Sequence, residues 1–325
     1  MKTCIVGAGA IGVFLGARLA ASGVEVAALA RGATAQALRE HGWRLESGGV
    51  LTSVPARVAE SAAKLGVQEL VLIAVKGPAL GGVATSIAPL LGPSTIVVTA
   101  MNGVPWWFFQ GFGGPHKGLQ LESVDPGGHI AAAIPASQVL GCVVHAACST
   151  PEPGMTRNAV GKRLIFGEPG GGKSLRLERV GALLGSAGFE VELSECIQRD
   201  IWYKLWGNMT MNPVSALTGA TVDRILDDPL VHRFCLAAMA EASAIGTAIG
   251  CPIAQSGEDR IAIARKLGAF KTSMLQDVEA GKPVELDALV TVVREIGERA
   301  GIATPNIDAL LGLARVQAQV RRLYP

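Results

Sequence analysis

The hydrophobic and polar positions follow two different patterns, and the change comes near residue 196. Before it, short apolar runs bounded by glycine and proline predict buried strands, whereas a segment between two of them predicts a helix. The predicted strands cover residues 2–6, 25–30, 69–75 and 95–99, with more strands over 139–166, and the helix covers 79–91. We therefore expect an α/β domain over residues 1–196, with a doubly wound sheet.

After residue 196, longer segments with helical spacing dominate. The predicted helices cover residues 199–217, 227–250, 256–281, 285–301 and 306–323. We expect residues 197–325 to form a second, all-α domain.

The first helix of that second domain carries a polar stripe. Lys204, Asn208 and Asn212 are spaced four residues apart, so their side chains share one face of a mostly apolar segment. An unpaired buried amide costs roughly 2 to 7 kcal/mol, so a bound substrate would be a fitting partner for this stripe. The alternative is an ordinary solvated helix face.

A glycine-rich turn follows the first predicted strand. Its residues are Gly7, Ala8, Gly9, Ala10, Ile11 and Gly12, and a helix-like segment comes next. The first glycine permits the tight turn, the second lets the backbone approach a pyrophosphate, and the third lets helix and strand pack closely. Such turns are common in a chain with 41 glycines, but the order strand, turn, helix predicts dinucleotide binding.

The second strand predicts which dinucleotide is bound. Arg31 follows it at the place where a fold that prefers NAD usually carries an acidic residue, and a guanidinium suits the 2′-phosphate of NADP(H). The alternative is an ordinary surface arginine. Lys76 and Asn102 follow the strands at 69–75 and 95–99, where open sheets bind ligands. A solvated loop lysine and a plain Asn-Gly turn are the alternatives.

Composition excludes several functions. A net charge of +2 with scattered basic residues gives no support for nucleic-acid binding. The six cysteines contain no CxxC pair and the five histidines form no ligand pattern, so we expect reduced thiols, a cytoplasmic protein and no metal. Residues 77–116 lack charged side chains, but prolines interrupt them too often for a membrane span.

Residues 105–138 are harder to interpret. Trp106, Trp107, Phe108, Phe109 and Phe112 are concentrated at their start, before a run rich in glycine and proline. This segment either covers the active site or packs onto the sheet as a hydrophobic plug, and the sequence does not distinguish the two.

Five motifs give the chain a specific resemblance. They are GAGAIG at 7–12, AVK at 74–76, MNG at 101–103, WYKLWGNMTMNPVSALTG at 202–219 and SMLQDVEAGKPVELD at 273–287. With them the chain resembles the ketopantoate reductases (2-dehydropantoate 2-reductases) over nearly its whole length. The resemblance implies a Rossmann domain, a helical domain, and NADPH-dependent reduction of a small 2-oxo acid in the cleft between them.

The resemblance also implies roles for single residues. Lys204 matches the catalytic lysine and general acid, and Asn208 and Asn212 match amides that orient the substrate. Ser273 and Glu285 match substrate-binding positions, and we expect Glu285 to assist catalysis by influencing the lysine's pKa. Ser273 and Asn102 are expected to engage the substrate carboxylate, and Asn102 and Lys76 match cleft residues of the nucleotide domain.

Some features depart from the family pattern. Lys282 and Val284 replace an arginine and a threonine, and residues 105–138 form a longer excursion than usual. A paralogous NAD(P)-dependent 2-hydroxy-acid dehydrogenase with another substrate is therefore the nearest alternative. A catalytically silent NADPH sensor is the alternative from another class. Apolar faces such as 310–320 suit a homodimer or a core equally, so the oligomeric state stays open.

Overall fold

The computed structural model describes residues 1–266 and 268–325, and their contacts divide them into two compact units. The first unit comprises residues 1–101 and 128–197, and the second comprises 102–127 and 198–325. The sequence-based division at residue 196 assigned residues 102–127 to the first domain. Their contacts group them instead with the helices of the second unit.

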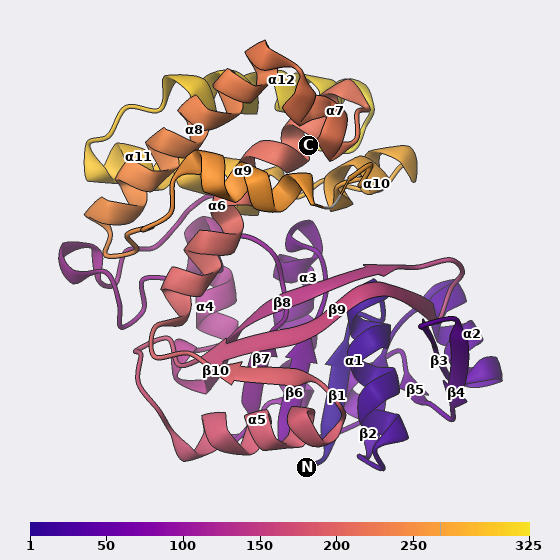
Figure 1. Cartoon of the computed structure of the whole chain (residues 1–325). Helices are drawn as coiled ribbons and strands as arrows, with labels where there is room; N and C mark the ends of the chain where they lie inside the picture. The colour runs from indigo at the N-terminus through magenta and orange to yellow at the C-terminus, as the bar shows by residue number, and fades with distance from the viewer. Residues whose placement is uncertain (267) are drawn as a thin grey trace. The chain divides into compact units, whose positions relative to one another are not determined.

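The first unit contains one mixed sheet. Among the described residues it has ten strands, in the order β4-β3-β9-β8-β7-β6-β1-β2-β5, with β10 beside β9 (Figure 1). The strands are β1 Thr3–Val6, β2 Val26–Leu29, β3 Trp43–Ser47, β4 Val50–Val54, β5 Arg57–Ala59, β6 Leu70–Ile73, β7 Ile96–Thr99, β8 Val139–Ser149, β9 Met155–Gly167 and β10 Glu190–Leu193.

The chain changes direction across the sheet at β1. From β1 it passes to β2 and later β5 on one side, and it then returns to β6, β7 and β8 on the other, with neighbours in this region all parallel. The carboxyl ends of β1 and β6 therefore meet at a topological switch point, where such sheets bind ligands. The predicted doubly wound Rossmann-type domain is confirmed.

Helices connect these strands. The α-helices are α1 Ala10–Ala21, α2 Gly32–His41, α3 Leu80–Ser86, α4 His129–Ala133 and α5 Leu175–Ser186. Short 3₁₀ turns cover Ala62–Lys64, Gly77–Ala79, Ala88–Leu90, Gly114–His116, Pro126–Gly128 and Ala136–Gln138. Of these, Gly114–His116 lies in the second unit, and Pro126–Gly128 crosses the boundary between the units. The helix predicted over 79–91 is interrupted between α3 and the turn at Ala88–Leu90, because Pro89 cannot continue an α-helix.

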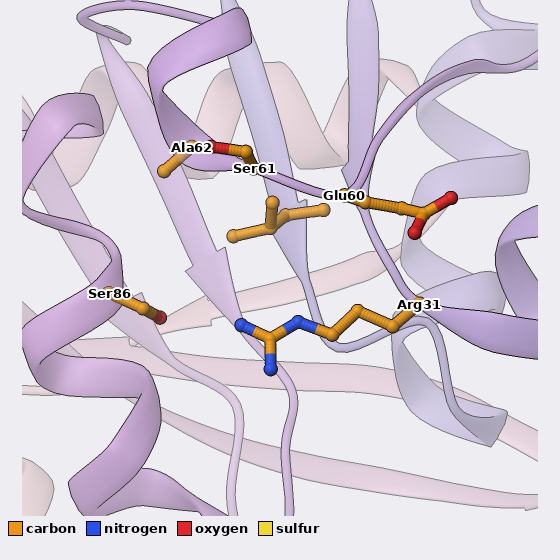
Figure 2. A pocket seen from close by; sticks show the side chains of 6 residues that line it. Arg31, Glu60, Ser61, Ala62 and Ser86 are labelled. Carbon is orange, nitrogen blue, oxygen red and sulfur yellow. The ribbon is translucent and has the colours of Figure 1, made fainter.

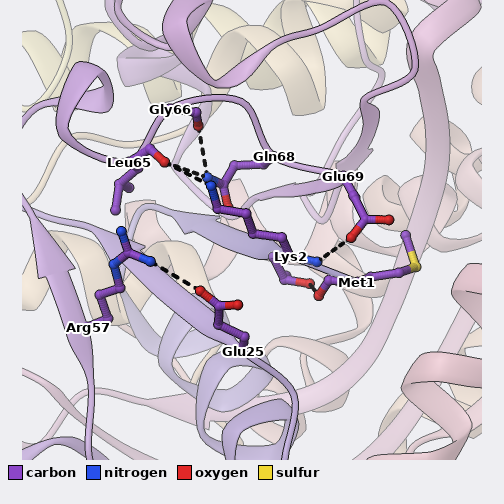
Figure 3. Close-up of polar contacts among 9 residues, drawn as sticks. Met1, Lys2, Glu25, Arg57, Leu65, Gly66, Gln68 and Glu69 are labelled. Atoms are coloured by element: carbon purple, nitrogen blue, oxygen red, sulfur yellow. Dashed lines mark hydrogen bonds and ion pairs between the residues drawn. The ribbon is translucent and has the colours of Figure 1, made fainter.

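Polar contacts anchor the amino ends of the central strands. The Lys2 backbone N–H donates to the Glu69 carboxylate over 2.8 Å, and its Nζ donates to the Leu65 carbonyl oxygen over 3.2 Å (Figure 3). The Gln68 amide donates to the Gly66 carbonyl oxygen over 2.8 Å. All residues of β1 and β6 are buried. With their amino ends anchored and their lengths packed in the core, the loops at their carboxyl ends start from fixed positions.

The second unit is helical, as predicted. Its helices are α6 Ile197–Thr218, which begins at the unit boundary, α7 Val222–Asp227, α8 Pro229–Ala248, α9 Gly257–Arg265, α10 Ser273–Glu279, α11 Val292–Ala300 and α12 Pro305–Val320. A π-helical turn, η7, covers Asp287–Thr291 directly before α11. Helix α8 contacts α7, α9, α11 and α12 and forms the centre of this unit (Figure 1).

Two tryptophans set the rotation of α6. The indole N–H groups of Trp202 and Trp206 donate to backbone carbonyl oxygens of α8, Ala242 over 3.2 Å and Met239 over 2.7 Å. Positions 202 and 206 lie on the side of a helix opposite position 204. Packing against α8 therefore turns the face that carries Lys204 away from α8.

The aromatic residues after Pro105 belong to the core of the second unit. Trp106, Trp107, Phe108 and Phe109 are all buried. The Phe108 ring lies 6.2 Å from the Trp202 ring between centroids, and the Gln198 amide donates to the Phe108 carbonyl oxygen over 3.2 Å. These contacts support the interpretation as a hydrophobic plug. The expected packing partner was the sheet, whereas these contacts are with α6 of the helical unit.

All six cysteines are free thiols, as expected, and Cys4, Cys142, Cys235 and Cys251 are buried. No metal-binding cluster and no helix able to span a membrane is found among the described residues.

Burial makes several thiols unreactive. It raises the pKa of Cys4 and Cys235 to about 12 and that of Cys148 to about 11. A thiol with so high a pKa is almost entirely protonated at pH 8, and only the thiolate is nucleophilic. We expect iodoacetamide at pH 8 to leave these three unlabelled in the native protein and to label them after unfolding, as read by peptide mass spectrometry. Fast native labelling of Cys4 would contradict the buried position.

Candidate active site

The polar stripe of α6 contacts the loop after β7. The Lys204 Nζ donates to the Asn102 side-chain oxygen over 2.8 Å, and both residues belong to the second unit. Asn102 is held in place by its neighbours, because the Val104 N–H donates to the Ala288 carbonyl oxygen over 2.9 Å. Gly103, with φ +83°, passes so close to Ala288 that a Cβ would lie 2.2 Å from its carbonyl oxygen. The backbone thus fixes the amide that accepts from the lysine.

The far end of the stripe contacts α10. The Asn212 amide donates to the Ser273 hydroxyl over 3.4 Å, and Asn212 is only 5% exposed. Ser273 is exposed at the first position of α10, where the Thr272 side chain caps the helix by accepting from the Leu275 N–H. Asn208 lies between the two contacts on the same face and is partly exposed.

Glu285 is a buried carboxyl group, 8% exposed, just before the π-helical turn η7. Its backbone carbonyl oxygen accepts from the Leu289 N–H over 3.2 Å, which joins Glu285 to the turn that begins at Asp287. π-Helical turns are frequent at functional sites. The same turn provides Ala288, which anchors the loop of Asn102. One irregular element therefore positions two of the predicted site residues.

The glycine turn has the geometry that its motif predicts. Gly7 has φ +91°, and a Cβ there would lie 2.5 Å from Val75 Cγ1. A Cβ on Gly12 would lie 1.9 Å from the Gly7 carbonyl oxygen, whereas one on Gly9 would meet nothing within 4 Å. Helix α1 starts here with no side-chain cap and no acidic residue in its first turn, which leaves a positive helix end for an anion.

A surface cavity of about 370 Å³ lies beside the carboxyl end of β2 (Figure 2). It is lined by Leu29, Arg31, Glu60, Ser61, Ala62 and Ser86, all of the first unit. The Arg31 side chain extends across it toward Ser86. Sequence reasoning found Arg31 but missed Glu60 and the two serines, because β5, which leads to Glu60, is too short to be recognised as a strand.

Lys76 lies three residues beyond the end of β6, on the carboxyl side of the strand, because the strand predicted over 69–75 ends at Ile73. It is the N-cap residue of a 3₁₀ turn and is partly exposed. Lys76 and the glycine turn belong to the first unit, whereas Lys204, Asn208, Asn212, Ser273, Glu285 and Asn102 belong to the second.

Comparison with known proteins assigns the chain to a class and then to a family. Residues 3–106 match the family model described as ketopantoate reductase PanE/ApbA, and residues 196–318 match the model of the C-terminal part of the same family. The chain is 43% identical to a 2-dehydropantoate 2-reductase of Mesorhizobium japonicum over 325 residues, which is 100% of both chains. The protein is an oxidoreductase. It belongs to the ketopantoate reductase family.

Solved structures agree with this assignment. A protein of Ralstonia solanacearum MolK2 assigned as a ketopantoate reductase is 61% identical, with a TM-score of 0.95 and 99% of each chain covered. A D-mandelate dehydrogenase, solved with NADH and anilino(oxo)acetate, has a TM-score of 0.85 at 20% identity and covers 99% of this chain and 100% of its own. At that identity it shows a shared fold.

Proposed function

We propose that the protein reduces 2-dehydropantoate to pantoate with NADPH, in the biosynthesis of pantothenate and coenzyme A. The observation that carries the proposal is the hydrogen bond between the Lys204 ammonium and Asn102, on a helix face that also carries the Asn212–Ser273 contact. Glu285 is a buried carboxyl group of the same unit. The 2-dehydropantoate 2-reductase of M. japonicum, which matches over its whole length, supports the substrate assignment.

Lys204 acts on the oxygen of the substrate ketone. NADPH, when bound, supplies a hydride to the keto carbon, and negative charge then develops on this oxygen. An ammonium within hydrogen-bond reach stabilises that charge and donates a proton to the oxygen. The Asn102 side-chain oxygen accepts one N–H of the ammonium and so orients it.

The remaining polar residues bind and orient the substrate. Asn208 and Asn212 on the polar face of α6, with Ser273 beside Asn212, present amide and hydroxyl groups that suit a carboxylate or a hydroxyl. The Glu285 carboxyl group is proposed to accept a hydrogen bond from the substrate hydroxyl.

The residues of the first unit fit a dinucleotide. The space above Gly9 admits a pyrophosphate, the uncapped start of α1 attracts its charge, and Lys76 lies at the adjacent strand end. Arg31, whose side chain extends across an open cavity at the end of β2, is placed to bind a 2′-phosphate. These features support NADPH as the preferred cofactor.

Replacing Arg31 by alanine should weaken NADPH binding by about 10- to 100-fold, because a charge-assisted contact to the 2′-phosphate is lost. NADH lacks that phosphate, so its affinity should stay unchanged. Fluorescence titration of both reduced cofactors measures the ratio. Arg57→Ala is the matched control, because Arg57 is paired with Glu25 and lies outside the cavity. A variant at Arg31 that keeps the full preference for NADPH would contradict the assignment.

The substrate assignment is tested by NADPH oxidation with 2-dehydropantoate beside a panel of branched and aromatic 2-oxo acids. We expect the highest kcat/KM with 2-dehydropantoate. Negligible turnover of this compound with good turnover of another 2-oxo acid would instead identify a 2-hydroxy-acid dehydrogenase. Tight NADPH binding without reduction of any 2-oxo acid would indicate a sensor.

A further inference from the structure

The cavity at the end of β2 contains an acidic residue that conflicts with NADPH. Glu60 lines the same cavity as Arg31. A 2′-phosphate carries close to two negative charges at neutral pH, so a carboxylate in its binding site repels it. A carboxylate at such a place accepts hydrogen bonds from the ribose hydroxyls of NADH instead. The cavity therefore has one group suited to each cofactor.

The Glu60 carboxylate is bound by a second arginine. Arg39, near the end of α2, donates from Nη2 to Glu60 Oε1 over 2.6 Å. In Figure 2 the Arg31 guanidinium extends across the cavity toward Ser86, whereas the Glu60 carboxylate points in the opposite direction. Arg39 does not line the cavity.

We propose that Arg39 is a positioning residue for cofactor choice, which holds the Glu60 carboxylate away from the 2′-phosphate subsite and neutralises its charge. The inference rests on the proposed NADPH-binding role of Arg31. Without Arg39, the Glu60 side chain is able to rotate toward the cavity, where it repels NADPH and accepts the ribose hydroxyls of NADH. Arg39 thus acts on the cofactor only through Glu60.

The pair is half exposed, with 48% of the Arg39 side chain and 52% of the Glu60 side chain accessible. Exposed ion pairs have small energies, so the effect on cofactor choice is modest. We expect the ratio of NADH to NADPH dissociation constants to fall by about fivefold in Arg39→Ala. Arg39→Lys, which keeps the charge, should restore most of the ratio.

A double-mutant cycle tests whether the effect passes through Glu60. Dissociation constants for NADPH and NADH are measured by fluorescence titration for the wild type, Arg39→Ala, Glu60→Gln and the double variant. Glu60→Gln alone should keep or raise the NADPH preference, and the double variant should resemble Glu60→Gln. Thermal unfolding of each variant checks that the fold is retained, and Glu60→Gln tests the inference if Arg39→Ala is unstable.

The outcomes separate this inference from the proposed function. If the wild type binds NADPH no better than NADH, the proposed cofactor preference fails. If the wild type prefers NADPH but Arg39→Ala weakens both cofactors equally, only the role of Arg39 is overturned. If the double variant resembles Arg39→Ala, then Arg39 contacts the phosphate directly, which also overturns the role through Glu60.

Discussion

A Lys204→Ala variant should turn over 2-dehydropantoate about 10²- to 10⁴-fold more slowly than the wild type, the usual contribution of a positioned proton donor. The loss should appear equally in kcat and kcat/KM, because the ammonium acts on charge that develops only in the transition state. NADPH affinity should be unchanged, since the glycine turn and Arg31 belong to the other unit. Steady-state kinetics and fluorescence titration measure the two quantities separately.

Lys282→Ala is the matched control for this prediction. Lys282 is an exposed lysine on the short connection between α10 and Glu285. Its replacement by alanine removes the same single positive charge from the same helical unit. It should leave turnover near the wild-type value. Near-wild-type turnover in Lys204→Ala, with normal NADPH binding, would remove the proposed role of the lysine as general acid.

The elements with strong local signals were predicted well from the sequence. The strand predicted over residues 2–6 is β1, and the helix predicted after the glycine turn is α1. A buried strand followed by a positive φ at Gly7, which glycine adopts readily, leaves few other local structures for this segment. The helix predicted over 199–217 is α6, Ile197–Thr218, and it continues through Pro213.

Other local signals were missed or misread. Gly48 and Gly49, both with positive φ, form the turn of the β3–β4 hairpin, and a Gly-Gly pair between two apolar runs is a recognised hairpin signal. The single helix predicted over 256–281 is wrong. Helix α9 ends at Arg265, and α10 begins only at Ser273, after positive φ at Gly268 and the cap at Thr272.

The contacts of the site could not be predicted from spacing. Asn102 and Lys204 are 102 residues apart, and their hydrogen bond depends on the π-helical turn that anchors the loop of Asn102. No local pattern predicted that turn, because residues 285–301 read as one regular helix. The grouping of these residues came from the family resemblance, and their individual catalytic roles remain predictions.

Gly9 and Gly12, the second and third glycines of the turn, should respond differently to substitution by alanine. A Cβ on Gly12 would lie 1.9 Å from the Gly7 carbonyl oxygen, so the backbone must shift. We expect Gly12→Ala to lower the free energy of unfolding by about 1 to 3 kcal/mol and to impair NADPH binding as well. Chemical denaturation and fluorescence titration measure the two effects.

Gly9→Ala isolates the role of the cofactor, because a Cβ there meets nothing within 4 Å in the protein. The variant should unfold at the same denaturant concentration as the wild type. If a pyrophosphate passes close to Gly9, the added methyl group displaces it, and both NADPH and NADH should bind roughly 10- to 100-fold more weakly. Both cofactors contain the pyrophosphate, so this variant, unlike Arg31→Ala, should leave their ratio unchanged. Normal affinity for both would show that the dinucleotide does not cross the turn at Gly9.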